Sequence, residues 1–81
     1  MKYACPCCGY LTFDEMPVGT FEICPVCYWE DDLVQGKDPN FVGGANEVSL
    51  NEAKANFLKF GAIKNECRRY VRQPLQEEIP K

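Results

Sequence analysis

The spacing of hydrophobic and polar positions changes twice along this chain. Before residue 34, short runs of alternating character predict a strand near residue 3, a strand at 10–13 and a returning strand at 20–23. Pro17 and Gly19 lie between the last two runs and are typical of a turn. Residues 34–48 are polar and contain the pair Gly43-Gly44, so we predict a loop there.

Helical spacing begins at residue 49. Ser49 and Glu52 have the spacing of a capping box, which predicts a helix from Leu50 to about Phe60, ended by Gly61. Apolar residues recur again over 63–72 and predict a second helix, with 75–81 as a tail. The expected apolar side of the first helix includes Leu58, and the expected core residues are Phe13, Phe21, Ile23, Trp29, Leu50, Phe57, Phe60 and Ile63.

Two Cys-x-x-Cys pairs bracket the predicted hairpin. Each has proline after its first cysteine, and together they supply Cys5, Cys8, Cys24 and Cys27. Four thiolates in this arrangement suit one tetrahedral ion, with Zn²⁺ as the expected cofactor and Fe as the alternative. Gly9 can take the positive φ that completes the first metal turn. Tyr28 stands at the matching position of the second turn, which we therefore expect to be less regular.

The two remaining cysteines need separate interpretations. Cys7 lies inside the first pair, and we expect an exposed bystander, with a redox or alternate-ligand thiol as the other interpretation. Cys67 falls on the apolar side of the second helix and is predicted to be a buried, inert thiol.

Three consecutive carboxylates follow a tryptophan, in the order Trp29, Glu30, Asp31 and Asp32. One interpretation is an interaction site or a second, hard-metal site closed by the loop that contains Asn46. The other is that the carboxylates cap a helical turn or pair with Arg68, Arg69 or Arg72. The chain has no histidine, and no serine or cysteine stands beside a recognisable base, so no catalytic residue is assigned. Whether the chain is an enzyme stays open, and a non-enzymatic module is favoured.

Length and charge narrow the function classes. The 81 residues fit one domain, which we divide into a metal ribbon with the acidic segment (1–33), a loop (34–48), helices (49–73) and a tail (74–81). The chain has nine basic and twelve acidic side chains, a balance that disfavours a nucleic-acid partner and favours a protein partner. Paired Cys-x-x-Cys spacing without an apolar leader indicates a reduced, cytoplasmic protein, and no apolar run is long enough to span a membrane.

Two resemblances add to this picture. The first third of the chain resembles rubredoxin in Cys8-Gly9-Tyr10, in residues 17–22 and in Cys24-Pro25-Val26-Cys27, which implies a four-thiolate site that holds iron and transfers an electron. Tyr28 and the shorter spacing between the pairs depart from that pattern. Most of the chain resembles the bacterial cysteine-rich CPCC family, in residues 5–10, 22–32, 43–46 and 49–62.

The fold class that we predict is a small α+β metal-stabilised domain. It has a rubredoxin-like zinc-ribbon β-hairpin followed by two short α-helices. The CPCC resemblance supports a domain that spans the whole chain and implies that the acidic segment and the Gly-Gly-Ala-Asn loop belong to the family's pattern. It implies no reaction.

Overall fold

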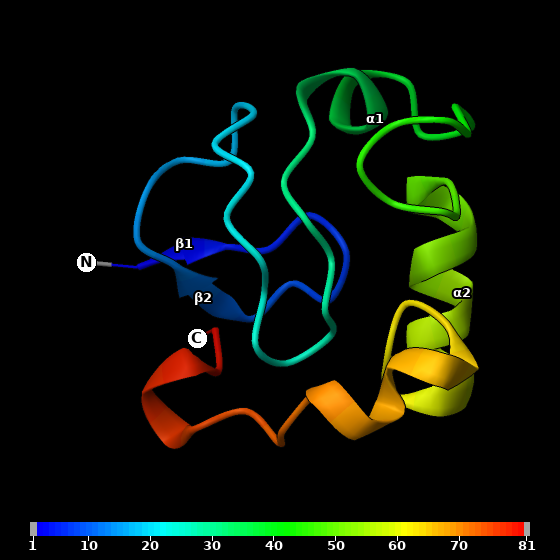
Figure 1. The fold of residues 1–81 in the computed structure, drawn as a ribbon. Coiled ribbons are helices and arrows are strands. Elements are labelled where there is room, and N and C mark those ends of the chain that lie inside the picture. Colours follow the sequence, from blue (N-terminus) through cyan, green and yellow to red (C-terminus); the bar gives the residue numbers. More distant parts are fainter. Residues whose placement is uncertain (1, 81) are drawn as a thin grey trace.

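The chain runs from a two-stranded hairpin on one side of the molecule to its longest helix on the opposite side, and its C-terminal end returns to the hairpin (Figure 1). This computed structural model describes residues 2–80. β1 (Tyr3–Ala4) and β2 (Leu11–Phe13) pair antiparallel, with Tyr3 opposite Phe13 and Ala4 opposite Leu11 and an irregular register between them. The predicted fold class is confirmed, because a two-stranded hairpin and a cysteine cluster are followed by helices.

The strand predicted at 20–23 is wrong. Only Ile23 forms a bridge, to Glu30, and Phe21 has a φ of 61°, which extended strands do not allow. Asp31 explains the bend, since its Oδ2 accepts hydrogen bonds from the backbone N–H groups of Gly19 and Thr20. The hairpin therefore encloses the first metal turn and does not bridge the two turns.

Four helical segments follow the hairpin within residues 2–80. They are α1 (Leu33–Lys37), α2 (Leu50–Phe60) and two 3₁₀ helices, η1 (Asn65–Tyr70) and η2 (Gln76–Glu78). α2 agrees with the prediction: the Ser49 hydroxyl accepts the N–H of Glu52, and Gly61 ends the helix at a φ of 81°. α1 lies in the predicted loop, although a helical turn capped by the acidic segment is one of the two interpretations of that segment, and the second predicted helix is a shorter 3₁₀ helix. None of the helices in residues 2–80 is long and apolar enough to cross a bilayer.

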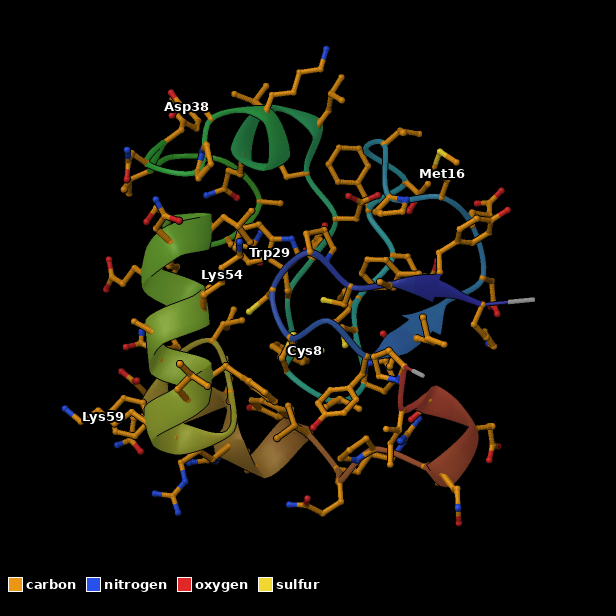
Figure 2. All side chains as sticks on the ribbon, turned by 180° about the vertical axis from the view of Figure 1, so that it is seen from behind. Cys8, Met16, Trp29, Asp38, Lys54 and Lys59 are labelled. Carbon is orange, nitrogen blue, oxygen red and sulfur yellow. The ribbon has the colours of Figure 1, made fainter. Side chains whose placement is uncertain are left out.

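The core is built around the cysteines. Phe13 and Trp29 are fully buried, and Leu50 and Ile63 are nearly so. The predicted core positions Phe21 and Ile23 are wrong, because their side chains are 60% and 44% exposed, and Leu58 on the predicted apolar side of α2 is 88% exposed. Phe57 packs against the core half-buried, and Phe60 is also half-buried. Figure 2 shows how the side chains fill the space between the hairpin and α2.

The C-terminal segment returns to the hairpin, where η2 contacts β2. Glu78 is buried, and its carboxylate accepts two hydrogen bonds of 2.8 Å from the Arg72 guanidinium. The segment predicted as a tail thus supplies a buried carboxylate to an ion pair with the exposed Arg72, and its last residue, Lys81, lies outside the described range.

Candidate metal centre

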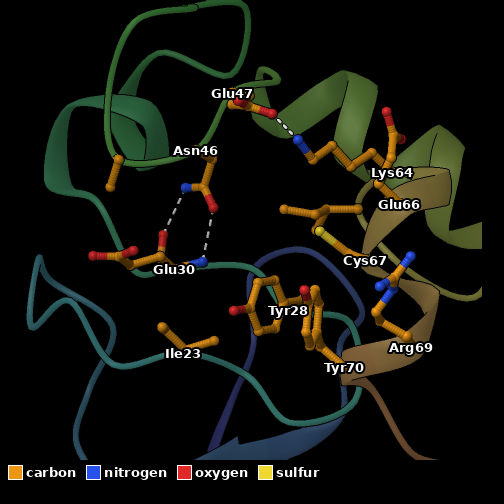
Figure 3. A pocket seen from close by; sticks show the side chains of 12 residues that line it. Ile23, Tyr28, Glu30, Asn46, Glu47, Lys64, Glu66, Cys67, Arg69 and Tyr70 are labelled. Atoms are coloured by element: carbon orange, nitrogen blue, oxygen red, sulfur yellow. Dashed lines mark hydrogen bonds and ion pairs between the residues drawn. The ribbon is translucent and has the colours of Figure 1, made fainter.

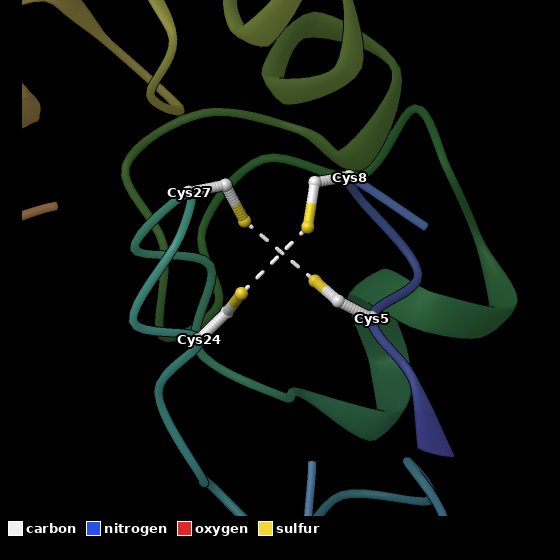
Figure 4. Close-up of side chains that lie close together, drawn as sticks. All are labelled: Cys5, Cys8, Cys24 and Cys27. Carbon is white, nitrogen blue, oxygen red and sulfur yellow. Dashed lines mark hydrogen bonds between the residues drawn. The ribbon is translucent and has the colours of Figure 1, made fainter. Parts of the chain in front are cut away.

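Four cysteine side chains point their sulfur atoms toward one another (Figure 4). The Sγ atoms of Cys5, Cys8, Cys24 and Cys27 all lie within 4.8 Å of one another. Cys5 and Cys27 are 3.6 Å apart, and Cys8 and Cys24 are 3.7 Å apart. Metal–sulfur bonds of about 2.3 Å in a tetrahedron place neighbouring sulfurs about 3.8 Å apart, whereas a disulfide requires about 2.05 Å. The cluster thus has the dimensions of a four-thiolate metal site.

The two metal turns have nearly the same backbone geometry. The N–H of Gly9 donates to the carbonyl of Cys5 at 2.9 Å, and the N–H of Tyr28 donates to the carbonyl of Cys24 at 2.8 Å. Gly9 has a φ of 81° and Tyr28 a φ of 77°. The expectation of a less regular second turn is therefore wrong, because Tyr28 adopts the left-handed conformation that glycine takes in the first turn.

Hydrogen bonds point at the sulfurs of the second pair. The N–H groups of Val26 and Trp29 lie 3.4 Å from the Sγ atoms of Cys24 and Cys27, respectively, and the Thr12 hydroxyl lies 3.1 Å from Cys24 Sγ. Such donors offset the negative charge of a thiolate.

The pKa values of the clustered thiols shift in different directions. Interaction with the nearby Cys27 sulfur, which lies within 4.8 Å, lowers the pKa of Cys24, and the same interaction raises the pKa of Cys27. Four thiolates at this spacing repel one another, and a divalent cation between them would remove that repulsion. The donor set therefore fits a cation that binds sulfur, such as zinc or iron.

The other two cysteines lie outside the quartet. Cys7 is buried, with 8% of its surface exposed, so the expectation of an exposed bystander is wrong. Cys67 is buried as predicted, and loss of water around its thiol raises its pKa. A raised pKa suits an unreactive thiol.

Two of the three consecutive carboxylates support the backbone. Asp31 is buried, and its Oδ2 accepts three hydrogen bonds, from the N–H of Gly19 and from the N–H and hydroxyl of Thr20. Asp32 caps α1 through the N–H of Gln35 and holds the glycine-rich loop through the N–H of Ala45, each at 2.9 Å. Capping by Asp32 follows the second interpretation of this segment, while Arg72 pairs with Glu78 rather than with the acidic segment.

The rest of the acidic segment is also held in place. The side chain of Asn46 makes two 2.8 Å hydrogen bonds to the backbone of Glu30, one to its N–H and one to its C=O. Trp29 is fully buried, and its indole N–H has no hydrogen-bond partner within the described part of the chain. Across residues 2–80, the cysteine quartet is the one group of three or more cysteine or carboxylate side chains close enough to share a metal ion.

Gln35 is a structural residue that sequence analysis missed. Its side chain is fully buried, and Nε2 lies within 3.3 Å of the carbonyls of Phe41, Asn46 and Val48. Its Oε1 accepts from the backbone and side-chain amides of Asn46. A glutamine in a predicted loop gave no sign of burial, since its hydrogen-bond partners lie in the later residues 41–48.

Fold and site together define a small ribbon domain with one four-cysteine centre. The family model of cysteine-rich CPCC proteins matches residues 3–78, and the chain belongs to this family. No curated protein matches the chain.

Proposed function

We propose that this chain is a zinc-stabilised protein-interaction module without catalytic activity of its own. The observation that carries the proposal is the quartet of sulfurs within 4.8 Å, three of them on buried cysteines and one on the half-buried Cys8, in a domain of 81 residues. A core of this size gives marginal stability, and a structural zinc ion would supplement it. The zinc would act as a fold-stabilising ion with a closed coordination sphere.

Exposed apolar side chains support an interaction role. Val18 and Leu33 line one shallow surface pocket, and both are exposed. Met16, Phe21 and Val34, on the same turn and on α1, are each more than half exposed. Apolar side chains gathered on neighbouring surface segments are typical of protein-binding surfaces.

Charge and redox state complete the proposal. The net charge of −3 disfavours phosphate backbones, so we expect a polypeptide partner and no nucleic acid. None of the six cysteines, all of which lie in residues 2–80, forms a disulfide, which suits a reducing, cytoplasmic environment.

Metal content and two cysteine variants test the metal role. We expect one zinc per chain in protein purified without added metal, and we expect Cys24→Ser to lose the zinc and most native structure, because three thiolates no longer close the coordination sphere. The measurements are elemental analysis and amide NMR dispersion. Cys67→Ser is the matched control, since it changes a buried thiol outside the quartet and should keep the metal.

Other outcomes would redirect the assignment. Retention of metal and fold by Cys24→Ser would refute the ligand set. One iron per chain, with a visible absorption that bleaches on reduction, would indicate a rubredoxin-like electron carrier instead of a zinc-stabilised module. An enzyme acting at Glu30, Asp31 and Asp32 requires free carboxylates, and addition of Mg²⁺ that shifts their NMR signals would favour it.

A further inference from the structure

A pocket of about 500 Å³ lies between the second metal turn and η1 (Figure 3). Pockets of this volume accommodate small molecules or single side chains of a partner. Tyr28, Ile63 and Cys67 contribute aromatic and apolar surface, and the side chain of Ile23 lies at its edge. The pocket is separate from the cysteine quartet, none of whose members line it.

Tyr28 occupies a backbone position that disfavours its own side chain. Its φ of 77° is left-handed, where a residue with a Cβ is strained, and glycine fills the same position in the first turn. Glycine would complete the metal turn without strain, so the turn itself does not explain a tyrosine. The ring of Tyr28 stacks on Tyr70, with 5.1 Å between the centroids and 23° between the planes, and it lines the pocket. The strained residue therefore provides an aromatic surface at this site.

Carboxylates outnumber cations by one around the pocket. Glu30, Glu47 and Glu66 contribute carboxylates, and Lys64 and Arg69 contribute cations. Glu47 forms an ion pair with Lys64, and the Arg69 guanidinium lies over the Tyr70 ring, 5.9 Å from its centroid. Glu30 and Glu66 have no ion-pair partner in residues 2–80. The backbone of Glu30 is also fixed by Asn46, so this carboxylate is attached to a rigid edge of the pocket.

We propose that this pocket binds a basic side chain, arginine or lysine, presented by a partner polypeptide. The aliphatic stem would lie on the apolar surface of Ile63 and Cys67, as long basic side chains do at protein surfaces. The cationic group would contact the ring of Tyr28, and the Glu30 side chain, which points away from that ring in Figure 3, would turn toward the pocket to form an ion pair with it. This inference rests on the proposed interaction role and names the chemistry that one surface recognises.

Capped pentapeptides Gly-Ala-X-Ala-Gly, with X as Arg, Lys, Leu or Glu, serve as probes. They are added to ¹⁵N-labelled, metal-loaded protein at low salt, and amide shifts are followed by NMR. We expect the Arg and Lys peptides to shift the amides of Tyr28, Glu30 and Cys67. Metal content and amide dispersion are recorded first, so a failure of the metal module is distinguished from a failure of the pocket.

Variants identify the groups involved. We expect Tyr28→Gly to stay folded and metal-loaded and to bind the Arg peptide about fivefold more weakly, and Tyr28→Phe to bind it normally. Glu30→Gln should also weaken binding, whereas Glu15→Gln, an exposed carboxylate that does not line the pocket, should not. If Tyr28→Gly unfolds, the proposal is tested by comparing Arg-peptide binding by Glu30→Gln with binding by Glu15→Gln.

Three results would overturn the proposal. The first is the absence of shifts at the pocket with any peptide, on folded and metal-loaded protein. The second is an equal or larger response to the Leu or Glu peptide, which would indicate an apolar or anionic ligand. The third is equal binding of the Arg peptide by Glu30→Gln and Glu15→Gln.

Discussion

The side chain of Gln35 connects α1 to the segment that leads into α2. It is fully buried and lies 3.0 Å from the carbonyl of Val48 and 2.9 Å from the side-chain amide of Asn46. Asn46 in turn holds both backbone polar groups of Glu30. One buried pair of amides therefore fixes the acidic segment and the glycine-rich loop relative to each other, and each member depends on the other for its hydrogen bonds.

Replacing Gln35 tests this pair of amides. We expect Gln35→Leu to lower the free energy of unfolding by at least about 2 kcal/mol, because it leaves the Val48 carbonyl and the backbone N–H of Asn46 buried without partners. Urea unfolding of metal-loaded protein measures the change. The exposed Gln73→Leu is the control and should stay within about 0.5 kcal/mol of the parent. Equal stabilities for the two variants would show that the buried contacts contribute little.

The glycines of α1 and of the loop that follows it have opposite surroundings. Gly36 is inside α1, and a Cβ added there would meet no atom within 4 Å. Gly44 is in the following loop, where an added Cβ would lie 2.8 Å from Asp32 Oδ2 and from Gln35 Cγ. The loop can approach the start of α1 only because residue 44 lacks a side chain.

Alanine at these two positions should change stability in opposite directions. We expect Gly36→Ala to raise the free energy of unfolding by about 0.5–1 kcal/mol, since alanine favours a helix more than glycine does. Gly44→Ala should lower it by about 1–3 kcal/mol, because the added methyl group displaces the Asp32 cap or Gln35. Thermal or urea unfolding measures both. A stabilised Gly44→Ala would mean that the loop moves freely away from α1.

Local signals explain what the sequence predicted of these elements. The capping residues and apolar spacing of α2 lie within the helix or next to it, and cysteine spacing alone predicted which four sulfurs converge. The five residues of α1 carry no helical repeat and include a glycine. Its N-cap residue, Asp32, is also held by the N–H of Ala45 in the loop. Residues 20–23 have the composition of a strand, but contacts with Asp31 bend the chain there. Tertiary contacts thus decided the elements that sequence analysis missed.

The second metal turn joins the two halves of the whole molecule. The carbonyl of Cys27 accepts the N–H of Ile63 at 2.9 Å, and the carbonyl of Pro25 accepts the N–H of Arg72 at 3.1 Å. The Arg72 side chain donates to the buried carboxylate of Glu78, which also accepts a hydrogen bond from the N–H of Leu75 at 2.8 Å. Loss of the metal should therefore disturb the structure as far as η2, because the C-terminal segments hydrogen-bond directly to the metal turn.

The Arg72–Glu78 pair gives this connection a pH dependence. Hydrogen bonding to Arg72 lowers the pKa of the Glu78 carboxyl below its ordinary value of 4.5. A carboxyl with a lowered pKa in the folded state stabilises the fold above its unfolded-state pKa, and the contribution is lost as the pH falls through the folded-state value. The pKa of Arg72 is raised by the same contact, so it stays charged throughout.

Replacing Glu78 should remove a contribution that is constant at neutral pH and disappears in acid. We expect Glu78→Gln to unfold at lower urea than the parent from pH 8 to about pH 5, and the difference to shrink below that, as the parent carboxyl becomes protonated. Glu77→Gln is the matched control, because Glu77 is exposed and forms no ion pair in residues 2–80. Each comparison is made between proteins of equal metal content, so that acid release of the ion affects both alike. A difference that stays the same down to pH 3 would mean that Glu78 acts through packing of η2 rather than through its charge.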